Sequence, residues 1–158
     1  MADRTRRFDE RGANLVEFVM ILPLLLLLVF GIIEFGINFD RKIATTNAAR
    51  EGARAAVVGV YPGACASGDS STDAMCTAIE RLGLDDSKTK AEVVLPDGTA
   101  EQGDPVVVCL EYPVESLTGI FSPFLAGSEL KGRAEMRIET ESGLTDAFTD
   151  EDLGWCNA

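Results

Sequence analysis

A long apolar run near the N-terminus is the most prominent pattern in the chain. Residues 18–33 are almost wholly apolar, and polar residues become frequent only after Phe39. As an α-helix, residues 13–39 would extend for about 40 Å, whereas the hydrocarbon core of a bilayer is ~30 Å thick. The pattern therefore predicts a transmembrane helix over residues 13–39. We expect a kink at Pro23, because in lipid the backbone has no better option than to stay helical.

The residues that follow predict that this helix continues beyond the bilayer. Residues 40–60 are rich in Ala, Arg and Glu, which favour helix. We expect a helical stalk that ends near Val60, where the turn-rich stretch "YPGACASGDSSTD" begins. Small residues such as Ala48 and Ala55 would give the stalk a face on which another element can pack closely.

Residues 61–158 are expected to form a small α+β domain. The stretch "STDAMCTAIERLG" predicts a short amphipathic helix, with N-cap candidates at Ser71 and Thr72 and a stop at Gly83. The apolar stretches "KAEVVLP" and "DPVVVCLEYPV" flank a turn signal and predict a β-hairpin, and "ELKGRAEMRIET" predicts a third strand. The fold class is therefore α+β: a long N-terminal transmembrane helix continuing into a stalk, followed by a small antiparallel sheet domain with a short helix.

The apolar stretch "SLTGIFSPFLAG", residues 116–127, allows two interpretations. It can be a short helix or buried loop that covers the sheet, or an exposed contact patch. We favour a place in the core, because a small sheet needs a cover.

Charge is distributed unevenly along the chain. The net charge is −12, and residues 40–158 carry 10 basic and 21 acidic residues, a balance of −11. The residues before the apolar run include four arginines: Arg4, Arg6, Arg7 and Arg11. By the positive-inside rule the N-terminus should lie in the cytoplasm and the acidic domain outside it. An acidic domain repels phosphate backbones, which argues against nucleic acid as a partner.

All four cysteines follow the apolar run: Cys65, Cys76, Cys109 and Cys156. An even number in a small domain outside the cytoplasm predicts two disulfides. Pairing Cys65 with Cys76 would close a short loop, and Cys109 with Cys156 would tether the tail, but the sequence allows three connectivities. Zinc is disfavoured, because no pair has the spacing of a zinc knuckle and the chain has no histidine.

The sequence provides no catalytic constellation. Without histidine it lacks the commonest general base and the usual activator of a serine or cysteine nucleophile. No glycine-rich loop has the spacing needed to hold phosphate. The acidic tail residues do not follow a calcium-loop pattern, so we expect a solvated tail there: Asp146, Asp150, Glu151 and Asp152. We therefore expect no enzyme activity, no cofactor and no metal.

Glu17 is the unexplained residue of the predicted span, because a carboxylate is costly there and usually has a partner or a role. It can also reach the headgroups as an ordinary interfacial charge. A cleaved secretory signal peptide is disfavoured, since the apolar run is longer than a signal core and no small-residue cleavage site follows it promptly.

The stretch "RGANLVEF" followed by an apolar run resembles the processing site of type IV prepilins. Together with "LPLLLLLVFGIIEFG" and "NAAREGARAAVVG", it looks like the TadE-like minor pilins, or pseudopilins, of the tight-adherence (Flp) pilus system. The resemblance is close over residues 12–59, and "LKGRAEMRIE" more loosely resembles the closing strand of that family. Major Flp pilins typically have tyrosine after the glutamate and are much shorter, so Phe18 and the acidic domain favour a minor component.

The resemblance implies that residues 1–12 are a cytoplasmic leader and that a prepilin peptidase cuts between Gly12 and Ala13. Glu17 and Phe18 would then act in assembly, with Glu17 neutralising the new amine at Ala13. The implied partners are the peptidase, other pilin-like subunits, the pilus assembly platform and the membrane. The implied location is the bacterial inner membrane, with a single span and an extracytoplasmic C-terminal domain, or a pilus on the cell surface.

A second hypothesis needs no pilus. The chain would then be an uncleaved single-span anchor that presents an extracytoplasmic ligand-binding module.

Overall fold

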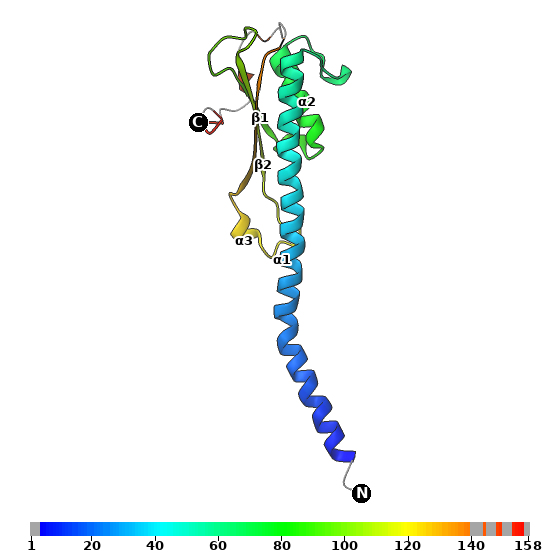
Figure 1. Cartoon of the computed structure of the whole chain (residues 1–158). Coiled ribbons are helices and arrows are strands. Elements are labelled where there is room, and N and C mark those ends of the chain that lie inside the picture. Colours follow the sequence, from blue (N-terminus) through cyan, green and yellow to red (C-terminus); the bar gives the residue numbers. More distant parts are fainter. Residues whose placement is uncertain (1–3, 140–143, 145–147, 150–152, 157–158) are drawn as a thin grey trace.

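The computed structural model describes residues 4–139, 144, 148–149 and 153–156. Its dominant element is the helix α1 (Arg4–Val58), which contains 55 residues and runs through Pro23 without a break. Figure 1 shows that the N-terminal half of α1 projects alone from the domain and curves away from the axis of the rest, whereas its C-terminal half is packed against the other elements.

The projecting half of α1 is the predicted span. Within the described part of the chain, α1 is the one helix long and apolar enough to cross a membrane, and its most apolar stretch is not covered by other residues. In a water-soluble protein such a helix would be buried in the core. Its exposed apolar side chains include Leu15, Phe18, Met20, Leu24, Leu27, Ile32 and Phe35.

The helix ends at Val58, close to the expected position. Gly59 adopts a left-handed conformation with φ of 67°, and its N–H bonds to the carbonyl of Ala55 at 2.9 Å. This is a common way for a helix to end, because glycine pays no steric penalty there.

The helix α2 (Ser70–Leu82) follows a 3₁₀ turn, η1 (Gly63–Cys65). The expected N-caps Ser71 and Thr72 are wrong, because the side chain of Asp69 caps the helix by accepting from the N–H of Thr72. The predicted stop is confirmed, since Gly83 is left-handed with φ of 64°.

A second 3₁₀ turn, η2 (Asp86–Lys88), leads into the sheet. Its strands are β1 (Lys90–Val94), β2 (Pro105–Pro113), β3 (Glu129–Arg137) and the two-residue β4 (Phe148–Thr149). Their order is β3-β2-β1-β4 and every pair is antiparallel. The predicted hairpin and third strand are confirmed, and together with α1 they confirm the α+β fold class.

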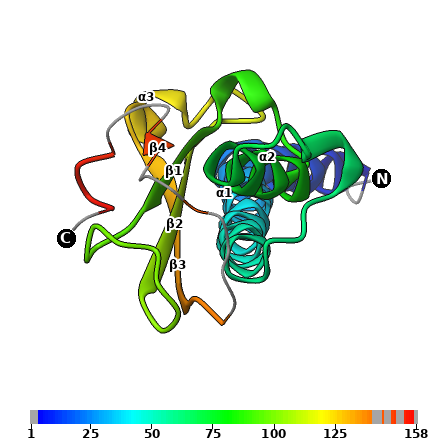
Figure 2. The same ribbon diagram turned by 90° about the horizontal axis from the view of Figure 1, so that it is seen from above.

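The central strand β2 is buried on both faces, and this determines the layers of the domain. Val106, Val108 and Leu110 face α1 and α2, whereas Val107 and Cys109 face the C-terminal segment. Figure 2 shows the sheet between the two helices on one side and the C-terminal segment on the other.

Small residues bring α1 very close to its neighbours. A Cβ added to Gly52 would lie 2.6 Å from the Cβ of Ala78 on α2. A Cβ added to Gly132 on β3 would lie 2.5 Å from the carbonyl oxygen of Thr45. The stalk therefore has a small-residue face, which includes the expected Ala48 and Ala55 but is formed mainly by Ala48, Ala49, Ala53 and Ala56, all almost wholly buried. Val58, which was also expected on this face, is 44% exposed.

Two disulfides join the four cysteines, in the pairing that the sequence analysis favoured among the three possible ones. Cys65 bonds to Cys76 across 11 residues, and Cys109 bonds to Cys156 across 47 residues. In the loop-entropy model these loops contribute about 3 and about 4 kcal/mol to stability. The second disulfide holds the C-terminal segment against the outer face of β2.

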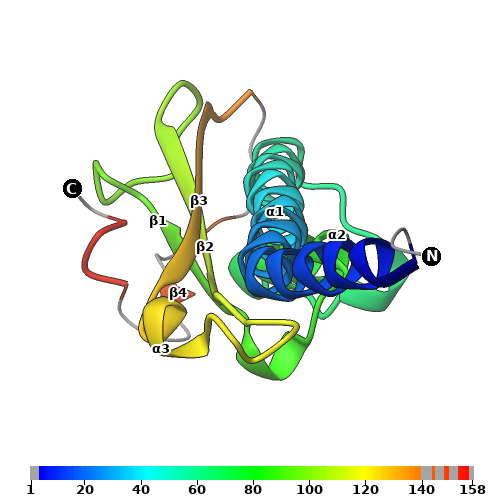
Figure 3. The same cartoon turned by 90° about the horizontal axis from the view of Figure 1, so that it is seen from below.

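The expectation that residues 116–127 are part of the core is wrong. They form a loop with one short helix, α3 (Ser122–Leu125), and Leu117, Ile120 and Phe124 are exposed. The reason is that α1 and α2 already cover one face of the sheet and the C-terminal segment covers part of the other. Figures 1 and 3 show that α3 lies beyond the end of the sheet, beside α1.

Candidate functional site

The residues of the predicted processing site lie on the projecting part of α1. Gly12 is exposed, and a Cβ added to it would have no neighbour within 4 Å. Ala13 and Glu17 are one helical turn apart, so they share a face of the helix. Phe18 is 60% exposed on the adjacent face. The structure thus leaves all four residues exposed on the projecting part of α1.

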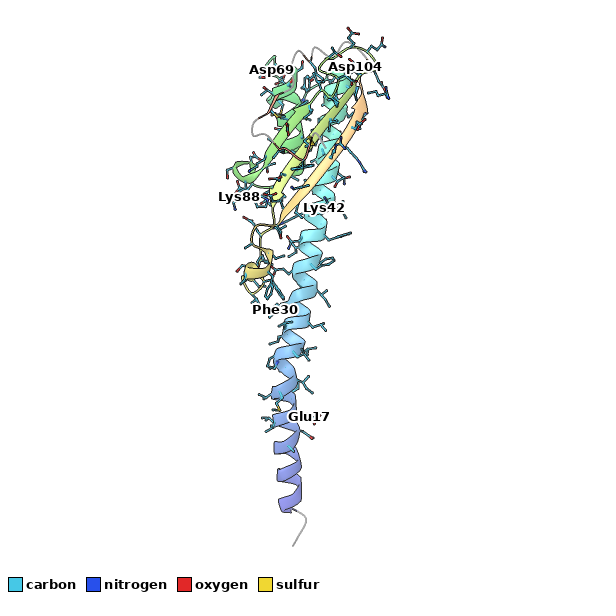
Figure 4. All side chains as sticks on the ribbon, turned by 90° about the vertical axis from the view of Figure 1, so that its left-hand side faces the viewer. Glu17, Phe30, Lys42, Asp69, Lys88 and Asp104 are labelled. Atoms are coloured by element: carbon cyan, nitrogen blue, oxygen red, sulfur yellow. A yellow bond between two sulfur atoms is a disulfide. The ribbon has the colours of Figure 1, made fainter. Side chains whose placement is uncertain are left out.

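Glu17 points away from the helix, far from the domain (Figure 4). Within the described residues its carboxylate makes no hydrogen bond or ion pair with the rest of the chain. An unpaired carboxylate on an otherwise apolar helix is costly in lipid. The free-energy cost falls when a positively charged group or a hydrogen-bond donor lies beside the carboxylate.

Sequence reasoning missed Glu34, which is the second acidic residue in the apolar part of α1. Its side chain is only 4% exposed. The backbone N–H of Leu117 donates to Oε1 at 2.8 Å, and the N–H and hydroxyl of Thr118 donate to Oε2 at 3.4 and 3.1 Å. A carboxylate near the end of an apolar run was the available signal, but nothing in the sequence identified its partner.

The loop of residues 114–128 brings these donors to Glu34. The N–H of Val114 bonds to the carbonyl of Ser128 at 2.9 Å, which closes the base of the loop where β2 ends and β3 begins. Inside the loop, the hydroxyl of Ser122 donates to the carbonyl of Gly119. These bonds give the loop a defined shape without a buried core of its own.

The loop also contacts α1 through apolar groups. A Cβ added to Gly31 would lie 3.6 Å from the ring of Phe121, so this ring rests on the helix. A hollow of about 210 Å³ lies beside this contact, and its lining includes Phe35, Phe124 and Leu125. Both the carboxylate of Glu34 and the apolar surface of α1 therefore hold the loop in place.

At the other end of the domain, Asp73 in the first turn of α2 holds the segment that connects Cys65 to this helix. It accepts from the N–H and hydroxyl of Ser67, at 2.7 and 2.6 Å, and from the N–H of Gly68 at 3.2 Å. Burial by itself would raise the pKa of Asp73, but these hydrogen bonds together hold its pKa below the ordinary value.

Two buried carboxylates fix the C-terminal segment. Glu92 on β1 accepts from the N–H of Leu153 at 3.1 Å, and Glu111 on β2 accepts from the indole N–H of Trp155 at 2.7 Å. Lys131 lies 3.7 Å from the Glu111 carboxylate and also covers the face of the Trp155 ring. These contacts are structural, because they connect parts of the same chain.

The described residues include no group of three or more His, Cys, Asp or Glu that could hold a metal. The four tail residues considered for calcium, Asp146, Asp150, Glu151 and Asp152, lie outside the described residues.

Comparison with protein families gives one match, to the TadE-like proteins, over residues 12–54. The match confirms the resemblance over this segment, which begins at Gly12 and ends inside the part of α1 that packs in the domain. It does not include the sheet, so the looser resemblance of "LKGRAEMRIE" stays a prediction. No curated protein and no solved structure matches the chain.

Proposed function

We propose that the chain is a membrane-anchored minor pilin of the tight-adherence pilus system, because residues 12–54 match the TadE-like family and α1 is long and apolar enough to cross a bilayer. In this proposal a prepilin peptidase cuts the chain between Gly12 and Ala13. The mature chain then joins other pilin-like subunits and the assembly platform through α1. The acidic domain of residues 61–158 favours a minor subunit, because major Flp pilins are much shorter.

One observation carries the proposal: the TadE-like match begins at Gly12, and the exposed helix surface that follows it contains an unpaired Glu17. A membrane anchor needs only apolar residues at this position. An exposed carboxylate five residues after a glycine is better explained by a partner that the isolated chain does not contain.

The cut would create that partner. It converts the amide nitrogen of Ala13 into a charged α-amino group, about 6 Å along the helix axis from Glu17. Opposite charges attract strongly where water is scarce, and each ion alone is costly in lipid. The amine of one chain can therefore pair with Glu17 of its own or a neighbouring chain and so fix how the helices align in an assembly.

Gly12 suits the cut for a conformational reason. The bond between Gly12 and Ala13 lies within a helix in the structure, whereas a protease binds an extended chain. Glycine is less stable in a helix than alanine by roughly 0.5–1 kcal/mol, and it leaves the backbone accessible. Local unwinding is therefore easier at Gly12 than at its neighbours.

Charge and disulfides support an N-terminus in the cytoplasm and the domain outside it. Four arginines precede the apolar run, and the domain is strongly acidic. The two disulfides fit an oxidising compartment. We place the span in the bacterial inner membrane, with residues 13–39 as the span and residues 40–60 as the stalk.

Replacing Glu17 by Gln tests the assembly role. In cells that make the pilus, Glu17→Gln should insert and be cut normally, because its shape and the cleavage site are unchanged. The amount of the chain cross-linked to other pilin-like subunits should fall several-fold, since the amide cannot neutralise the amine. The matched control is Glu51→Gln, an exposed glutamate in the part of α1 that packs in the domain. Normal cross-linking of Glu17→Gln would show that Glu17 is only an interfacial charge.

A further inference from the structure

We infer that the loop of residues 116–127 is inserted into the outer leaflet of the bilayer, so that the domain rests in the membrane surface and is not held above it. This inference depends on α1 spanning the bilayer with the domain on the outer side, as proposed above, and it does not depend on cleavage at Gly12 or on a pilus.

The position of the loop along α1 is the first reason. Its contacts are with Gly31, Glu34 and Phe35, all of which lie before the first charged residue of the stalk, Asp40. Asp40 follows Glu17 by 23 positions, which is about 35 Å of helix and close to the ~30 Å of hydrocarbon. Glu34 is then about 9 Å, and Gly31 about 14 Å, below the level of Asp40.

The composition of the loop is the second reason. Residues 116–127 contain no charged side chain. Leu117, Ile120 and Phe124 are exposed by 65%, 52% and 83%, although large apolar side chains in water are normally covered when they are clustered. These three side chains form an apolar patch that adjoins the exposed apolar surface of α1. The acyl chains of the bilayer would cover both surfaces at once.

The polar groups of the loop are the third reason. Lipid offers no hydrogen bonds to exposed backbone, so an irregular loop can enter it only if its polar groups have partners in the protein. Glu34 accepts three hydrogen bonds from Leu117 and Thr118, and the interior of the loop is bonded between Gly119 and Ser122. Conversely, the loop covers a carboxylate that would otherwise lie unpaired in hydrocarbon.

Charged residues mark the level at which the loop leaves the lipid. Lys42 donates to the carbonyl oxygen of Lys131, and Lys88 lies 2.5 Å from Glu115 at the base of the loop. Figure 4 shows α3 between the levels of Phe30 below and of Lys42 and Lys88 above. These partly exposed lysines suit the headgroup region, where their long stems can lie along apolar surface. At this level Lys88 pairs with Glu115 and Lys131 pairs with Glu129, at 2.5 and 3.5 Å, so the acidic groups at the ends of the loop have basic partners.

Quenching by brominated lipids tests the inference on the full chain in phosphatidylcholine vesicles. Phe124→Trp places a fluorophore on the exposed tip of the loop, where it should not disturb folding. Val60→Trp places one at another exposed position, at the far end of the stalk, and Trp155 of the unsubstituted chain gives the background. When the acyl chains carry bromine, Phe124→Trp should lose several-fold more emission than Val60→Trp or the unsubstituted chain.

Two results would overturn the inference. Emission from Phe124→Trp that bromine leaves unchanged and aqueous iodide quenches would place the loop in water. Blue-shifted emission that neither agent quenches would show that protein covers the loop, as it would if a second subunit packed there.

Discussion

The carboxylate of Glu34 accepts a hydrogen bond of 2.8 Å from the backbone N–H of Leu117, which lies 83 residues further along the chain. This bond connects the apolar part of α1 to the loop between β2 and β3. The domain is therefore attached to the helix at two levels: at the loop, and along the stalk where Gly52 and Thr45 contact α2 and β3. Movement of the helix relative to the domain requires breaking both.

Removing the Glu34 carboxylate should release the loop. In Glu34→Ala two backbone N–H groups and one hydroxyl lose their acceptor, and an unsatisfied buried donor costs about 1–3 kcal/mol. Hydrogen exchange of the Leu117 and Thr118 amides in detergent or lipid should become roughly tenfold faster or more. Glu34→Gln keeps one acceptor oxygen and should fall between Ala and the unsubstituted chain. Unchanged exchange in Glu34→Ala would show that other contacts hold the loop.

A side chain at Gly132 should separate α1 from the sheet. Its Cβ would lie 2.5 Å from the Thr45 carbonyl oxygen, and backbone atoms cannot move aside as a flexible side chain can. Gly132→Ala should lower the free energy of unfolding by about 1–3 kcal/mol, as measured by denaturant unfolding. Gly63→Ala is the matched control, because nothing lies within 4 Å of its added Cβ. Equal stability of the two variants would contradict the close packing.

The lowered pKa of Asp73 predicts loss of stability in acid. A carboxyl group whose pKa is lower in the folded than in the unfolded chain stabilises the fold above its unfolded pKa of about 3.9. That contribution disappears as the pH falls through the folded pKa, because protonation ends the acceptance of bonds from Ser67 and Gly68. Asp73→Asn should lower the melting temperature at neutral pH, and the effect should shrink as the pH falls below the ordinary pKa of an aspartate and through the lower folded pKa of Asp73. The exposed Asp97→Asn serves as control, and an Asp73→Asn effect that does not shrink in acid would be inconsistent with the account.

The two disulfides should differ in what they protect. Replacing Cys109 and Cys156 by Ala removes about 4 kcal/mol of loop constraint, against about 3 kcal/mol for Cys65 and Cys76. Only the first replacement should make the C-terminal segment sensitive to protease, because the disulfide and the Glu111 bond to Trp155 hold it together. Peptide mapping after brief proteolysis distinguishes the two variants, and equal cleavage of both would refute this assignment.

The elements with strong local signals could be predicted from the sequence. The apolar run and the helix-favouring stalk predicted α1 from residue 13 onward, although the helix begins at Arg4, and the two apolar stretches with Asp97 and Gly98 between them predicted the hairpin. Cysteine positions predicted two disulfides and favoured the observed pairing, but they could not exclude the two other connectivities, since the choice depends on which face of β2 the tail covers.

The errors come from long-range contacts. The loop of residues 116–127 was expected in the core because its composition is apolar, but its place depends on what already covers the sheet. Glu34 was missed because its donors are backbone N–H groups from that loop, which have no sequence signature. The N-cap was misplaced by two or three residues, since Asp, Ser and Thr are all good caps and "DSST" offers a choice.

The most direct test of the central claim is the N-terminus of the chain purified from cells that contain the prepilin peptidase. Mass spectrometry of the N-terminal peptide should show a chain that begins at Ala13. Gly12→Leu should remain uncut, whereas Gly36→Leu, at an equally open glycine of α1, should be cut as usual. A mature chain that retains Met1, or cutting of Gly12→Leu to the same extent as Gly36→Leu, would contradict the account.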